Sequence, residues 1–125
     1  MNEKKNPVGW FEIPVIDMKR AKAFYEHVFS LSLQDQQMGD THMALLPMFQ
    51  GAAGAAGCLV KGKDYTPAAA GVLIYFTAPD LEGMLQRVRQ RGGRVLMDKS
   101  SIGSYGFIAL IQDTEGNRIG LHRRL

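Results

Sequence analysis

The sequence has few of the features that mark extracellular, membrane-spanning or nucleic-acid-binding proteins. Its one cysteine, Cys58, cannot form a disulfide within the chain, which fits a reducing compartment. No stretch approaches the length of a bilayer-spanning helix, and the opening residues 1–6 lead into no long apolar run, so we expect no secretory signal. We therefore expect a cytoplasmic protein with no membrane partner.

The excess of positive charge is small and lacks the residues that usually accompany it in nucleic-acid-binding proteins. The net charge is +3, and the arginines gather in residues 87–94 and 118–124. No aromatic residues alternate with them, and no known DNA-reading motif is present. We interpret these arginines as the solvated face of a helix and a basic tail, and expect no nucleic-acid partner. The 125 residues are enough for one domain with its own core.

A stretch near the start of the chain recurs in its second half. Residues 9–18 and residues 72–81 each form an apolar run that ends in an aspartate, followed by an amphipathic segment. Two copies are too few for a solenoid, so the repeat predicts one domain built from two related halves.

Each half is predicted to contain one helix and four strands. Asp17 and Asp80 are placed to cap the helices, because a carboxylate accepts hydrogen bonds from the exposed N–H groups of a first turn. Apolar residues then recur at helical spacing, and Gly92 and Gly93 end the second helix. The predicted strands are residues 10–15, 33–38, 42–48, 58–60, 71–77, 94–97, 105–111 and 118–122.

The order strand, helix, strand, strand, strand therefore occurs twice, which predicts an α+β fold of two βαβββ modules. One helix covers one face of each four-stranded sheet, and the other face needs a partner sheet, a second subunit or a ligand. We expect the two sheets to form a half-open, curved trough.

Several motifs resemble those of the vicinal oxygen chelate superfamily, which includes glyoxalase I, bleomycin-resistance proteins and extradiol dioxygenases. They are Trp-Phe-Glu-Ile-Pro-Val at 10–15, Asp17, Arg20-Ala21, Phe24-Tyr25 and Asp-Thr-Glu-Gly-Asn-Arg-Ile-Gly-Leu at 113–121. The resemblance implies a single domain over residues 7–123, with halves of about 7–61 and 71–123. It also implies a homodimer whose subunits share their troughs.

The same resemblance implies three positions for the ligands of a divalent metal. Carried over to this chain, they fall at Trp10, Leu73 and Gly120. An indole N–H is only a donor, leucine has no lone pair and glycine has no side chain, so none of the three can hold a metal ion. We expect neither a metal nor another cofactor.

Candidate ligand-binding residues follow from strand parity. Trp10 and Glu12 share one face of the first strand, and Tyr75 and His122 share a face with the two other lost metal positions. His42 is placed at the mouth of the trough, and Phe107 in its wall. Core packing, surface ion pairing or a dimer interface is the alternative explanation for these residues. Glu12, His42 and His122 also have the chemistry of a displaced zinc or iron site, but their spacing does not support one.

Three functions remain open at this point. The first is a metal-free protein that binds a small, mostly apolar molecule in the trough. The second is a metal-dependent lyase, isomerase or dioxygenase of the glyoxalase type. The third is a protein-interaction domain that keeps the fold without a small ligand. The sequence assigns no catalytic residue and identifies no ligand.

Overall fold

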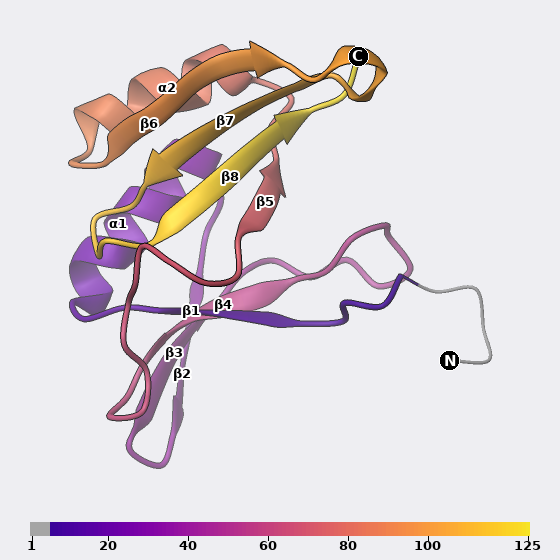
Figure 1. The fold of residues 1–125 in the computed structure, drawn as a ribbon. Helices are drawn as coiled ribbons and strands as arrows, with labels where there is room; N and C mark the ends of the chain where they lie inside the picture. Colours follow the sequence, from indigo (N-terminus) through magenta and orange to yellow (C-terminus); the bar gives the residue numbers. More distant parts are fainter. Residues whose placement is uncertain (1–5) are drawn as a thin grey trace.

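The computed structural model describes residues 6–125, and it contains two helices and eight strands in the predicted order (Figure 1). The first module comprises β1 (Phe11–Pro14), α1 (Met18–Phe29), β2 (Gln34–Met38), β3 (Thr41–Leu45) and β4 (Gly57–Lys61). The second comprises β5 (Ile74–Thr77), α2 (Leu81–Gln90), β6 (Arg94–Ser101), β7 (Phe107–Gln112) and β8 (Arg118–Arg123), with a short 3-10 helix, η1 (Gly103–Tyr105). The α+β class and the two βαβββ modules are confirmed.

Each module forms one open four-stranded sheet, and the two sheets have the same topology. The strand orders are β1-β4-β3-β2 and β5-β8-β7-β6. In each sheet the first strand pairs in parallel with the last strand of its module, and the remaining pairs are antiparallel. The sequence repeat is therefore a repeat of structure.

Both helices begin at the predicted aspartates. Asp17 accepts a hydrogen bond from Arg20 N at 3.0 Å, and Asp80 accepts one from Gly83 N at 3.3 Å. The residues predicted from helical spacing are the ones that each helix buries. They are Met18, Ala21, Phe24, Tyr25 and Val28 on α1, and Leu81, Met84, Leu85 and Val88 on α2.

Some strand limits differ from the prediction for local reasons. Strand β3 ends at Leu45, before Pro47, which has no N–H to donate to a sheet. Strand β6 continues to Ser101 through two register shifts, where apolar alternation is lost. Strand β7 starts at Phe107 because η1 and the left-handed Gly106, with φ of 106°, precede it.

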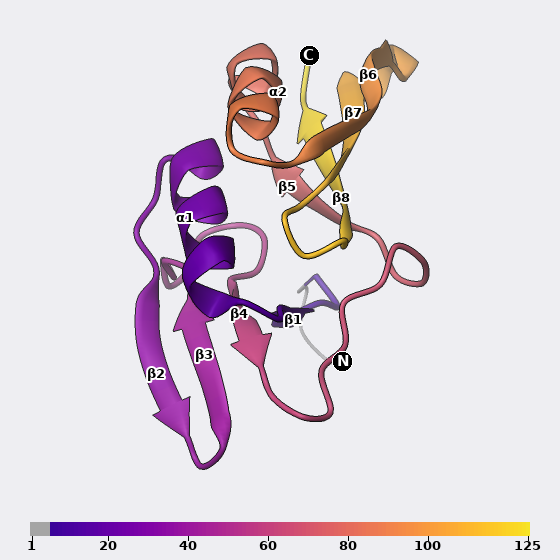
Figure 2. The same ribbon diagram turned by 90° about the vertical axis from the view of Figure 1, so that its left-hand side faces the viewer.

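The helices fill the angle between the two sheets, so the molecule has one core with its other sheet faces turned outward (Figure 2). Core residues come from the helix-facing sides of both sheets, such as Ile13 on β1 and Leu121 on β8. The helices also touch each other, with Arg87 Nε donating to Val28 O at 3.0 Å. We call the outward faces of the two sheets the open faces. No helix within residues 6–125 is long and apolar enough to cross a membrane.

Candidate functional site

The open face beside β1 carries the first two candidate residues. Ile13 and Val15 are buried on the helix side, so alternation turns Trp10 and Glu12 to the open face, where both are exposed. The predicted parity of this strand is confirmed.

Trp10 and Glu12 line a cavity of about 470 Å³ at the junction of the two modules. Its floor and walls come from β1, from the linker between β4 and β5, and from the start of β8. Most of its lining is apolar, and the polar lining residues are Glu12, Thr66, Asn117 and Arg118. The apolar ones are Val8, Trp10, Phe11, Ile13, Pro14, Ala68, Ala70, Val72, Ile74 and Ile119. We call this space the junction cavity.

Glu12 lies next to two other titratable groups. A hydrogen bond from the Tyr65 phenol to Glu12, together with the negative charge of Glu12, raises the pKa of Tyr65. Cys58 is paired with Glu12 across β1 and β4, and burial, followed by the Glu12 charge, raises the pKa of its thiol to about 11. Cys58 is therefore held as a neutral thiol, which is a poor nucleophile and a poor metal ligand.

Tyr75 lies on the open face of the second sheet and covers Gly120. The two residues are paired across β5 and β8. A Cβ atom at position 120 would lie 2.4 Å from Tyr75 Cδ1 and 2.6 Å from its Cε1, closer than such atoms approach in proteins. The aromatic ring therefore occupies the space that a side chain at position 120 would need, and Tyr75 is still 45% exposed.

His122 shares this open face but lies apart from the junction cavity. Its Nε2 makes a 2.7 Å hydrogen bond with the carbonyl oxygen of Tyr105, which fixes the ring beside η1. The structure thus brings Trp10 and Glu12 together in one cavity, and it places Tyr75 and His122 on the other sheet.

Two expected trough residues, His42 and Phe107, lie on the opposite side of their sheets. His42 shares the helix-facing side of β3 with buried Ala44, and its Nε2 pairs with Asp35 at 2.9 Å. Phe107 packs against the core, with Lys99 Nζ 4.8 Å from the centre of its ring. Placing them in the trough was wrong, because strand parity had not been applied to β3 and β7.

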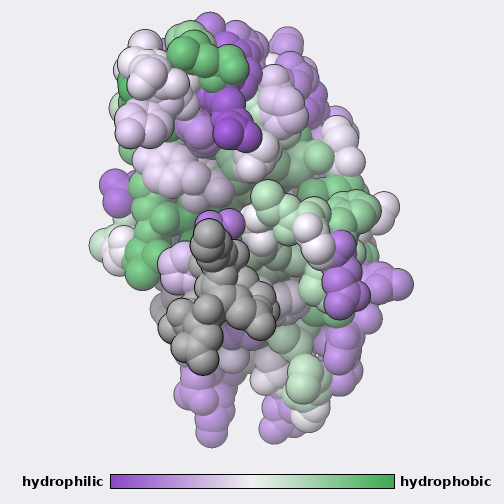
Figure 3. All heavy atoms as spheres, turned by 90° about the vertical axis from the view of Figure 1, so that its right-hand side faces the viewer, coloured by the Kyte–Doolittle hydropathy of each residue, from purple (hydrophilic) through white to green (hydrophobic). Residues whose placement is uncertain are grey.

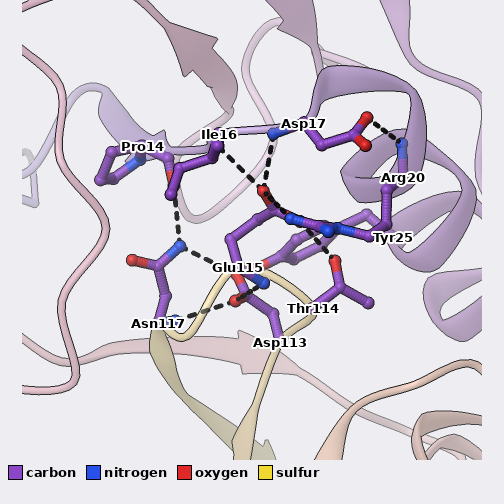
Figure 4. Close-up of polar contacts among 9 residues, drawn as sticks. All are labelled: Pro14, Ile16, Asp17, Arg20, Tyr25, Asp113, Thr114, Glu115 and Asn117. Carbon is purple, nitrogen blue, oxygen red and sulfur yellow. Dashed lines mark hydrogen bonds and ion pairs between the residues drawn. The ribbon is translucent and has the colours of Figure 1, made fainter.

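A second polar region, whose role was not predicted from the sequence, joins the two modules on the side of the helices (Figure 4). The turn of residues 113–117 between β7 and β8 contacts the first module through buried Asp113, Glu115 and Asn117. We call these three side chains and their partners the junction network.

Asp113 organises the turn. Its Oδ1 accepts hydrogen bonds from Glu115 N and Asn117 N at 2.9 Å, and its Oδ2 accepts one from the Tyr25 hydroxyl at 2.6 Å. Asn117 Nδ2 donates to Pro14 O at 2.8 Å and to Asp113 Oδ2 at 3.0 Å. A buried carboxylate with this many donors ties β8 to β1 and α1.

Glu115 holds the start of α1. It accepts hydrogen bonds from Ile16 N and Asp17 N at 2.8 Å and forms a two-point ion pair with Arg20. Burial favours the protonated acid, but hydrogen bonds from Arg20, Asp17 and Ile16 outweigh it and lower the pKa of Glu115 to about 2. In the sequence, Arg20 and Tyr25 stand out only as parts of a motif, because no sequence spacing reveals contacts across 88–95 residues.

The relationship to known proteins agrees with this architecture. A sequence model described as "Glyoxalase/Bleomycin resistance protein/Dioxygenase superfamily" matches residues 8–121. The chain belongs to this superfamily. A glyoxylase-like domain-containing protein of Didymella fabae is 26% identical over 114 residues, which cover 88% of each chain.

Solved structures of the superfamily share the fold. TnmS3, an antibiotic binding protein from Streptomyces sp. CB03234, matches 99% of this chain and 100% of its own, with a TM-score of 0.70 and 24% identity. A glyoxalase/bleomycin resistance protein from the same Streptomyces strain matches 91% and 97%, with a TM-score of 0.68 and 25% identity. Glyoxalase I from Zea mays matches with a TM-score of 0.67 and 17% identity, and the present chain spans only 46% of its length.

The residues present do not fit the divalent metal that superfamily enzymes hold. The resemblance carries the ligand positions to Trp10, Leu73 and Gly120, which offer no ligand atom, and the Tyr75 ring fills the space over Gly120. Within residues 6–125, no three His, Cys, Asp or Glu side chains are grouped so as to hold a metal ion. In particular, Glu12, His42 and His122 are not gathered into a site.

Proposed function

We propose that this superfamily member binds a small, mostly apolar molecule in the junction cavity and that it does so without a metal ion. The observation that carries the proposal is the cavity itself, in which apolar side chains surround a few polar groups. Binding sites for small molecules commonly have this composition, because burial of apolar area drives binding and a few polar groups fix orientation.

Trp10 is the principal apolar surface of the proposed site. It is large and flat, and it is 41% exposed where it lines the cavity, so a ligand that covers it removes apolar area from water. The related TnmS3 is an antibiotic binding protein, and its likeness over nearly all of both chains supports a binding function here.

We further propose that the protein is a homodimer in which a second copy covers the open faces around the junction cavity and leaves the cavity itself accessible. The supporting feature is the apolar surface that the chain leaves exposed, part of which crosses the middle of the face seen in Figure 3. Surfaces of this kind commonly mark interfaces. Outside the junction cavity, exposed large apolar residues include Met38, Met48, Phe49, Tyr75 and Leu96. Sedimentation equilibrium tests this point, and a mass equal to one chain at all concentrations would contradict it.

We also propose that the protein is located in the cytoplasm. The single cysteine cannot form a disulfide within the chain, which supports a reducing, cytoplasmic location.

The fluorescence of Trp10 tests the binding function directly, because it is the only tryptophan in the chain and it lines the cavity. Titration with neutral planar aromatics such as quinones and aromatic ketones is expected to quench its emission saturably. Chelator added beforehand is expected to leave the titration unchanged. Absence of saturable binding across a broad panel, or binding that is lost with chelator, would contradict the proposal.

A further inference from the structure

The junction cavity contains one acidic and one basic side chain that are not paired with each other. Glu12 and Arg118 both line it. Among residues 6–125, no ion pair within 4.0 Å links either of them to any other residue. Four other arginines have a carboxylate partner, and Arg91, Arg94 and Arg124 have none within residues 6–125, so it is the position of Glu12 and Arg118 in the cavity that sets them apart.

The other polar groups of the cavity have less capacity to recognise a ligand. The side chain of Asn117 is already committed, since Nδ2 donates to Pro14 O and Asp113, and Oδ1 accepts from Ala68 N at 3.1 Å. Thr66 contributes an uncharged hydroxyl. Glu12 and Arg118 are therefore the two strong anchors that the cavity offers.

The surroundings of Glu12 keep it available as an acceptor. The Tyr65 phenol interacts with this carboxylate, and a carboxylate has room for about four hydrogen bonds. The facing residue on β4, Cys58, is a neutral thiol. Trp10 lies two residues before Glu12 on the same face, so an aromatic wall stands beside a negative charge, an arrangement that attracts organic cations.

Desolvation decides what class of ligand fits such a cavity. A neutral apolar ligand would remove part of the water that solvates Glu12 and Arg118 without replacing it, so it should bind more weakly than a ligand that pairs with both groups. A ligand with a single charge would satisfy one group and repel or desolvate the other. Only a ligand with both charges leaves neither group without a partner.

Building on the proposed function, we propose that the ligand is an amphoteric aromatic molecule. An apolar ring system lies against Trp10, a basic amine binds Glu12, and a carboxylate or similar acid binds Arg118. This assigns Glu12 and Arg118 as specificity-determining residues of the cavity.

Four probes that share a naphthalene ring test the assignment by isothermal titration calorimetry. They are 2-naphthylmethanol, 2-naphthylmethylamine, 2-naphthylacetate and 3-(2-naphthyl)alanine, which are neutral, cationic, anionic and zwitterionic. We expect the zwitterion to bind at least about threefold more tightly than the alcohol, the scale of a partly exposed charge pair.

Two variants separate the roles of the anchors. Glu12→Gln is expected to lower the affinity for the amine and for the zwitterion by about threefold to fivefold. The affinity for the acetate is expected to stay the same or to rise. Arg118→Gln is expected to give the reverse pattern. Asp40→Asn and Arg91→Gln change the same charges outside the cavity and serve as matched controls, for which no change is expected.

The possible results distinguish this inference from the proposed function. If the alcohol binds and both charged anchors prove irrelevant, the cavity is a binding site but the amphoteric assignment is wrong. If none of the four probes binds and no neutral aromatic quenches Trp10, the proposed function itself fails. If Glu12→Gln lowers the affinity for all four probes equally, the substitution has altered folding or packing at β1. That result would overturn the role assigned to Glu12.

Discussion

The junction network and the junction cavity lie next to each other, yet their polar groups are used in opposite ways. Asn117 belongs to both, and in the network every charged group has a partner at hydrogen-bond distance. In the cavity, Glu12 and Arg118 have no ion-pair partner within the described chain. Buried polar groups that are paired within the protein have a structural role, and we propose that the two charges lining the cavity are left for a ligand.

The largest expected effect is the loss of the network's central carboxylate. Asp113→Ala leaves the Tyr25 hydroxyl, the Asn117 amide and two backbone N–H groups without their acceptor. We expect the free energy of unfolding to fall by about 3–5 kcal/mol, measured by urea denaturation. Asp98→Ala, which removes an acid whose side chain is 70% exposed, is the control and should change stability by less than about 0.5 kcal/mol. Equal effects of the two substitutions would show that the network is not a structural tie.

The second-largest expected effect is a pH dependence of stability that arises from Glu115. Its pKa is lowered from 4.5 to about 2, so its stabilising contribution is complete above about pH 4.5 and is lost as pH falls toward 2. We expect Glu115→Gln to cost roughly 2–3 kcal/mol at pH 7, and this difference from the native protein should shrink between pH 4.5 and 2. Urea midpoints at a series of pH values measure it. A difference that stays constant with pH would contradict the ion pair with Arg20.

A smaller effect is expected when one hydrogen bond of the network is removed without leaving a gap. Tyr25→Phe keeps the buried ring and removes the hydroxyl that donates to Asp113 Oδ2 at 2.6 Å. Because Asn117 still donates to that oxygen, we expect a loss of about 1–2 kcal/mol in the free energy of unfolding. The double variant with Asp113→Ala should then lose less than the sum of the two single losses. Strict additivity would mean that the two groups do not interact.

A substitution in the junction cavity is expected to have the smallest effect on stability and the clearest effect on binding. Trp10→Ala removes a side chain that is 41% exposed, so stability should fall by less than about 1 kcal/mol. Calorimetric affinity for 3-(2-naphthyl)alanine should fall by about tenfold or more, as befits an aromatic anchor. Phe49→Ala, which removes another exposed aromatic residue outside the cavity, is the control. An unchanged affinity of the Trp10→Ala variant would show that Trp10 is not part of the binding site.

The sequence predicted the modules well because their signals are local. Helical spacing identified the buried face of α1 from Met18 to Val28, and both helix caps, Asp17 and Asp80, were found from residue type and position. Strand parity placed Trp10 and Glu12 on the open face for the same reason, since alternation needs only neighbouring residues.

The site was predicted less well because its assembly depends on contacts between distant segments. The contact of Tyr75 with Gly120, and the closure of the cavity by linker residues 66–72, have no signature in spacing. His42 and Phe107 were assigned to the trough by residue type, and the register of β3 and β7 places them on the helix-facing side. Arg118, one of the two proposed charged anchors, was interpreted from the sequence as part of a basic tail and of the motif at 113–121.

The metal content of the protein tests the central claim most directly. Protein purified without affinity metal or chelator can be analysed by mass spectrometry of the elements while its ligand affinity is measured on the same sample. We predict far less than one equivalent of transition metal per chain and saturable ligand binding that chelator does not change. About one tightly held nickel, zinc, manganese or iron ion per chain, with binding or turnover that depends on it, would contradict the account.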